Sequence, residues 1–140
     1  MPRDIIVVIE SAGNIPNPAC FEVLGLAINL APSRLVVVAL GDDLDSIEEH
    51  FRCSEIHELV KIEHSCLENY TSDAYIVALA TLIKDRRPNL VLFAHTYQTR
   101  DYASALAYEF GTSLVVDGLS VKEDERGWLV ERQLFQGRAI

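Results

Sequence analysis

Asp4-Ile5-Ile6-Val7-Val8-Ile9, near the start of the chain, is a β-branched run in which apolar and polar residues do not alternate. A run of this kind predicts a strand that is buried on both faces, as in a parallel sheet. The same pattern returns at residues 34–40 and 90–94. Residues 56–62 form a weaker and more polar version, which predicts a strand at an edge of the sheet.

Helical patterns separate these runs. Residues 18–30 carry an apolar stripe, with Asn17 as the expected N-cap and Pro18 at the first helical position. We expect further helices at residues 44–51, at 72–85 with Ser72 as the cap, and at 101–110 before Gly111. Strands that alternate with helices predict parallel pairing, with helices on both faces of the sheet.

The end of the chain follows a different pattern. Residues 114–121 and 128–135 flank the polar turn 123–127, which ends in a glycine, so we expect an antiparallel β-hairpin. The whole pattern predicts an α/β fold of three layers, α/β/α, with a mostly parallel, Rossmann-like sheet. With the strands numbered along the chain, the expected order is 3-2-1-4-5.

Composition excludes several classes of function. The chain has 140 residues, which suits one domain, and a net charge of -9 without a Lys/Arg cluster of the kind that binds nucleic acid. It has no apolar run of about 18 residues, so we expect no membrane insertion. Three cysteines without CxxC spacing predict free thiols in a reducing, cytoplasmic compartment.

No metal site or catalytic group is expected. The four histidines have no spacing typical of metal ligands, and no Ser/His/Asp order or pair of carboxylates stands out. Two nucleotide-binding motifs, GxxxxGK[ST] and GxGxxG, are absent. We therefore expect neither an enzyme nor a dinucleotide site of the common dehydrogenase type.

The polar segment 95–101 is the best candidate for a site. Ligands of open parallel sheets bind beyond the carboxyl ends of the strands, which here means two loops. One is residues 10–14, after the first predicted strand, and the other is this segment, which follows the fourth. Thr96, Thr99, Arg100 and Asp101, with the first amides of the next helix, could hold an anion or a nucleotide. The alternative is that Thr99 or Asp101 caps the helix while Arg100 pairs with a carboxylate.

Residues 73–117 resemble the segment that identifies electron-transfer flavoprotein α subunits. The matching positions follow the order of that family's motifs: Pro88-Asn89-Leu90-Val91-Leu92, Thr96, Arg100-Asp101 and Asp117. The opening strand with Glu10 and Gly13, and the closing residues 131–140, are similar to the family as well. Thr99 stands where the family has Gly, Ser104-Ala105 where it has Pro-Arg, and Ser11 where it has His.

The resemblance implies a division of labour. It implies a fold similar to the adenine nucleotide alpha hydrolases, with residues 1–140 as one domain and the FAD-binding second domain outside this chain. FAD would be bound by the full-length protein or the complex and not by this chain alone. The implied partner is the electron-transfer flavoprotein β subunit, and the complex would serve dehydrogenases and a quinone reductase.

Two other readings stay open. The chain could be a stand-alone regulatory domain of the same fold that binds an adenine nucleotide such as AMP. It could also be a pure interaction module, or form a homodimer in isolation.

Overall fold

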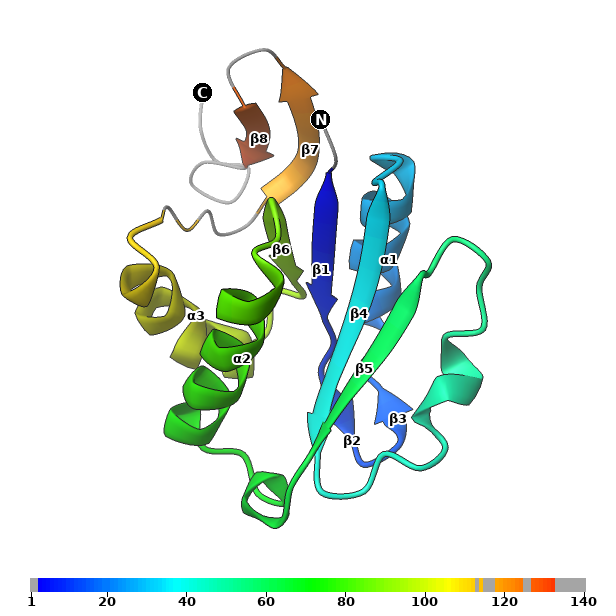
Figure 1. Ribbon diagram of the computed structural model, residues 1–140, viewed down its shortest axis with the longest axis vertical. Helices are drawn as coiled ribbons and strands as arrows, with labels where there is room; N and C mark the ends of the chain where they lie inside the picture. The colour runs from blue at the N-terminus through cyan, green and yellow to red at the C-terminus, as the bar shows by residue number, and fades with distance from the viewer. Residues whose placement is uncertain (1–2, 113, 115–117, 125–126, 133–140) are drawn as a thin grey trace, which may run out of the picture.

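Four strands form one parallel sheet in the order β5-β4-β1-β6 (Figure 1). The computed structural model describes residues 3–112, 114, 118–124 and 127–132. The strands are β1 (Asp4–Val8), β4 (Arg34–Gly41), β5 (Glu58–Glu63) and β6 (Leu90–Phe93). All four pair in parallel, so the predicted parallel sheet and the order of its first four strands are confirmed.

The most apolar run lies in the middle of the sheet. In β1, Ile5 pairs with Leu35 on one side and with Leu90 on the other. The side chains of β1 from Ile5 to Val8 are at most 3% exposed. This burial on both faces explains why the run lacks alternation.

Helices cover both faces of the sheet, as predicted. On one face, α1 (Ala19–Asn29) packs against Ile5 and Val7 of β1. On the other, α2 (Ser72–Arg86) and α3 (Tyr97–Glu109) pack against Ile6 and Val8. Successive residues of a strand point to opposite faces, so a single strand supplies both cores. No helix in the described residues is long and apolar enough to cross a membrane.

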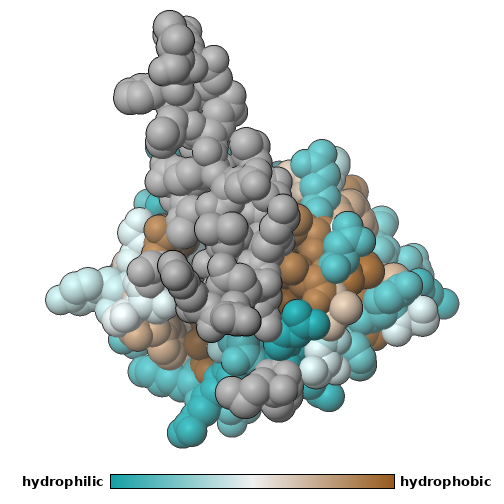
Figure 2. Space-filling view, turned by 90° about the horizontal axis from the view of Figure 1, so that it is seen from above, coloured by the Kyte–Doolittle hydropathy of each residue, from teal (hydrophilic) through white to brown (hydrophobic). Residues whose placement is uncertain are grey.

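The edges of the sheet are less buried than its centre. Every side chain of β6 is partly exposed, and β5 is partly exposed along its length, as predicted for an edge strand. Figure 2 views the molecule from the side on which the strands begin, and hydrophobic side chains are visible there beside hydrophilic ones.

Some predicted boundaries were wrong. The helix expected at residues 44–51 is only a short 3-10 helix, η1 (Ile47–His50), and a second one, η2 (Ser65–Leu67), precedes α2. Two short strands, β2 (Ser11–Ala12) and β3 (Ile15–Pro16), were not expected. The third strand, expected at residues 56–62, is β5.

The predicted caps shift by a residue or more. Thr71, not Ser72, caps α2, and its hydroxyl accepts a hydrogen bond from the Ala74 amide at 3.4 Å. Helix α1 begins at Ala19, whose amide donates to the Asn17 side chain at 3.0 Å. Gly111 ends α3 as predicted, because its positive φ of 60° suits glycine.

The predicted hairpin is confirmed. Strand β7 (Gly118–Asp124) pairs with β8 (Gly127–Arg132) in antiparallel fashion. Within the described residues these strands pair with each other and not with the four-stranded sheet. The fifth strand of the expected order was placed at residues 114–121, next to β6. Of these, residues 115–117 lie outside the described part of the chain, and residues 118–121 belong to β7, which pairs with β8 and not with β6 in the described residues.

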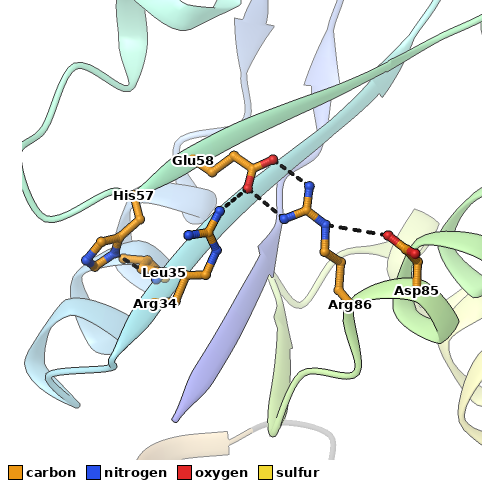
Figure 3. Close-up of polar contacts among 6 residues, drawn as sticks. All are labelled: Arg34, Leu35, His57, Glu58, Asp85 and Arg86. Atoms are coloured by element: carbon orange, nitrogen blue, oxygen red, sulfur yellow. Dashed lines mark hydrogen bonds and ion pairs between the residues drawn. The ribbon is translucent and has the colours of Figure 1, made fainter. Parts of the chain in front are cut away.

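An ion-pair cluster ties α2 to the edge of the sheet (Figure 3). The two carboxylate oxygens of Glu58, at the start of β5, accept from two nitrogens of Arg86, at the end of α2, at 2.6 and 2.5 Å. Arg34 of β4 donates to the same carboxylate at 2.5 Å. Hydrogen bonds from Arg86, aided by Arg34, lower the pKa of Glu58 to about 2.

We expect Glu58→Gln to destabilise the protein in a pH-dependent way. Because the folded pKa lies below the ordinary value of 4.5, the stabilisation is present above pH 4.5 and is lost as the pH falls toward 2. The Glu58 side chain is 28% exposed, so solvent screening reduces the expected cost at neutral pH to about 1–2 kcal/mol. Urea unfolding at a series of pH values measures this difference.

Glu49→Gln is the control, because Glu49 is exposed on η1 and makes no ion pair in the described part of the chain. A cost for Glu58→Gln that is the same at pH 7 and pH 3.5 would show that the ion pairs are not its cause.

Candidate functional site

An open hollow lies where the sheet ends, at the carboxyl end of β1. Its volume is about 470 Å³, and residues 10–12, residues 15–18 and Gln98 line it. The short β2–β3 hairpin forms one wall, and the starts of α1 and α3 adjoin it. This is the edge at which open parallel sheets bind ligands.

Glu10 lies at the centre of this edge. Its carboxylate accepts from the Asn17 side-chain amide at 3.0 Å and from the Thr96 hydroxyl at 2.8 Å. The backbone carbonyl oxygen of Glu10 accepts from the backbone amide of Asn17 at 2.8 Å, and the backbone amide of Glu10 donates to the Cys20 sulfur at 3.2 Å. Glu10 therefore joins the end of β1 to the start of α1 and the start of α3.

The predicted loop at residues 95–101 is mostly the first turn of α3. Thr96 caps this helix, because its hydroxyl accepts from the Thr99 amide at 3.1 Å. The helix therefore begins at Tyr97, four residues earlier than predicted, and Thr99, Arg100 and Asp101 are helical. The alternative that Thr99 or Asp101 provides the cap is wrong, since Thr96 does so.

Two of the four predicted site residues come together and two do not. The hydroxyl oxygens of Thr96 and Thr99 are 3.1 Å apart, and Thr96 contacts Glu10. Asp101 instead accepts from the Tyr70 hydroxyl at 2.6 Å. Arg100 is exposed, and in the described residues it forms no ion pair with a carboxylate.

Aromatic side chains pack behind the start of α3. The rings of Tyr70 and Tyr75 lie 4.9 Å apart, and those of Tyr75 and Tyr102 lie 5.6 Å apart. Phe93 lies 5.8 Å from Tyr102. Burial raises the pKa of the Tyr102 hydroxyl and that of the Tyr70 hydroxyl. The hydrogen bond to Asp101 raises the pKa of Tyr70 further. These tyrosines stay neutral and act as packing and hydrogen-bonding groups.

The sequence analysis missed Glu10 as a site residue. Residues 10–14 were one of its two candidate loops, but it gave the carboxylate no role. Nothing in the local pattern shows that Thr96, 86 residues away, contacts the carboxylate. The signal that could have found it is a lone acidic residue directly after a fully apolar strand. Parallel pairing of β1 with β6 brings the two segments together.

Elsewhere, Asp43, Asp45 and Glu63 form the one group of potential metal ligands found within the described residues. All three are exposed. Exposed carboxylates often lie this close together without binding an ion, so we assign no metal to them.

We expect Thr96→Val to lower the free energy of unfolding by about 1–3 kcal/mol, because it removes both the cap of α3 and the bond to Glu10. Thr96→Ser keeps the hydroxyl and should retain most of the stability. Denaturant unfolding measures the change, and amide exchange at the start of α3 locates it. Equal losses in both variants would exclude the hydroxyl as the cause.

Comparison with known proteins identifies the family. The model of the electron transfer flavoprotein domain matches residues 5–140. The electron transfer flavoprotein subunit alpha of Syntrophomonas wolfei is 28% identical over 135 residues, which cover 96% of this chain and 42% of that protein. The corresponding protein of Bacillus subtilis is 24% identical over 141 residues, covering 100% and 43%.

A third relative carries a different name. The acryloyl-CoA reductase electron transfer subunit beta of Anaerotignum propionicum is 29% identical over 119 residues, which cover 82% of this chain and 32% of that protein. The chain spans about two fifths of the length of the α subunits that it matches, in their amino-terminal part. The matches confirm the resemblance seen in residues 73–117, and the chain therefore belongs to the electron transfer flavoprotein domain family.

Proposed function

We propose that this chain is the amino-terminal domain of an electron-transfer flavoprotein α subunit and supports FAD-dependent electron transfer by assembling with a β subunit. The observation that carries this proposal is the family match across residues 5–140, with relatives named as α subunits over nearly the whole chain. The family is one of electron carriers and not of enzymes. In this role the chain supplies a folded surface and no reacting group.

The residues at the carboxyl edge do not fit the pyrophosphate of FAD. The acidic residue Glu10 lines the hollow, and none of the lining residues is Lys or Arg. The turn after β1 holds the single glycine Gly13, whereas dinucleotide-binding turns use several glycines to let the backbone approach phosphate. We therefore derive no electron-transfer step through these residues and propose that the flavin is bound outside this chain.

The proposal extends to the other partners of the complex. Through it, the flavin would receive electrons from dehydrogenases and pass them to a quinone reductase. The compartment that we propose is the cytoplasm, in line with the three free cysteines.

Flavin absorbance tests this proposal. We expect the purified 140-residue chain to be colourless, and a longer form that continues beyond residue 140, co-purified with a β subunit, to carry FAD. Light scattering on the short chain reports whether it forms a homodimer. Flavin bound tightly by the short chain, or none bound by the complex, would overturn the proposed division of labour.

A second candidate function is adenine-nucleotide binding through Thr96, Thr99, Arg100 and Asp101. It is favoured by the position of Thr96 at the start of α3, beside the hollow. Calorimetry with AMP and ATP separates the two functions. We expect no heat at millimolar nucleotide, because the Glu10 carboxylate would repel phosphate. Micromolar binding that is lost in Arg100→Ala would favour the nucleotide-binding function instead.

A further inference from the structure

Glu10 is a partly buried carboxylate without a cationic partner among the described residues. The groups that contact it, the Asn17 amide and the Thr96 hydroxyl, are neutral. No Lys, Arg or His of the described chain forms an ion pair with it. Acidic side chains removed from water are usually paired, because desolvation of an unpaired charge is costly.

The negative charge of Glu10 acts on its surroundings. Burial is the main cause that raises the pKa of the Cys20 thiol and of the hydroxyls of Tyr70, Tyr75 and Tyr102. The charge of Glu10 adds to the rise in all four groups. Four neighbours on two faces of the sheet thus experience a negative charge that no cation of the described chain neutralises.

The carboxylate also has room for another donor. Each of its oxygens accepts one hydrogen bond from the groups described above, and a carboxylate offers about four acceptor positions. A planar guanidinium can donate to both oxygens at once, and an ammonium group can donate to either.

Half of the residues that line the hollow are apolar. Ala12, Ile15, Pro16 and Pro18 line it, and the Ile15 side chain is 70% exposed. Ser11, Asn17 and Gln98 add neutral polar groups. Arginine and lysine combine an apolar stem with a cationic end, so their shape and charge match a hollow that is lined by these apolar side chains and by Glu10.

We propose that this hollow receives a basic side chain, Arg or Lys, from a partner protein, whose cationic end pairs with Glu10 while its stem lies against Ile15. The proposal rests on the proposed function in one respect, since the partner it names is the β subunit of the complex. Charge supports it, because a chain with a net charge of -9 attracts a partner through a basic surface.

Nuclear magnetic resonance on the 140-residue chain tests the hollow without any partner. The probe is Nα-acetyl-arginine amide, and the neutral comparison is Nα-acetyl-citrulline amide, which has nearly the same shape. We expect the cationic probe to shift the amide signals of residues 10–18 and Gln98 in a saturable way, with a Kd in the millimolar range. The citrulline compound should leave them unchanged.

Three variants locate the effect. Glu10→Gln should weaken binding of the cationic probe at least tenfold. Ile15→Ser should also weaken binding, because it removes an apolar contact for the stem of the probe and leaves the Glu10 carboxylate in place. Asp85→Asn is the matched control, because Asp85 is an 82% exposed carboxylate at the end of α2, near the opposite edge of the sheet. Circular dichroism checks that each variant is folded. If Glu10→Gln does not fold, Ile15→Ser still tests the proposal.

The outcomes are distinct. Saturable shifts with the arginine compound that disappear in Glu10→Gln or Ile15→Ser, and persist in Asp85→Asn, support the proposal. It is overturned if the arginine compound causes no saturable shift, if citrulline amide binds equally well, or if inorganic phosphate shifts the same amides. Because no β subunit or flavin takes part, failure here leaves the flavin experiment as an independent test of the proposed function.

Discussion

The parallel pairing of β1 between β4 and β6 is the constraint on which the rest of the structure depends. It buries both faces of one short run, with Ile5 and Val7 supplying the core beneath α1, and Ile6 and Val8 supplying the core beneath α2 and α3. Burial at this scale is the main driving force for folding. The same pairing brings the loop after β1 next to the loop after β6, although the chain runs through four other strands, two α-helices and two 3-10 helices between β1 and β6.

The pairing of β1 with β6 also decides which groups surround the negative charge of Glu10. Residue 10 is the second residue after β1, and the start of α3 adjoins it, so the Glu10 carboxylate meets the Thr96 hydroxyl. In nucleotide-binding relatives of this architecture, the corresponding edge holds phosphate on glycine-rich turns and helix amino termini. Here a side chain of the protein supplies the negative charge. This charge repels anionic ligands from the edge and attracts cationic ones.

The two ends of the strands thus differ in their electrostatics. We call the side of the sheet on which the strands begin its amino edge, and the side on which they finish its carboxyl edge. At the amino edge, the carboxylate of Glu58 is held by Arg34 and Arg86 (Figure 3), and its charge is neutralised within the chain. At the carboxyl edge, Glu10 has only neutral partners among the described residues. The first arrangement stabilises the fold, whereas the second leaves a charge that the proposed partner protein can neutralise.

The sequence by itself determined the architecture. A β-branched run without alternation can only be satisfied by burial on both faces, so the strands, their parallel direction and the helices between them follow from residues 4–9 and their repeats. The order of motifs in residues 73–117 was also enough to indicate the family. Gly111 marked the end of α3, because a positive φ is a local demand that glycine meets without strain.

Only the tertiary structure decided the site. Caps depend on hydrogen bonds whose strength changes with a shift of one residue. The cap of α2 is therefore Thr71 and not the expected Ser72, and because Thr96 caps α3, that helix begins at Tyr97. Glu10 acquires its role from Thr96, a contact between segments far apart in the chain. Local pattern reports periodicity and turn chemistry, whereas the meeting of a carboxylate with a distant hydroxyl is set by strand order and register.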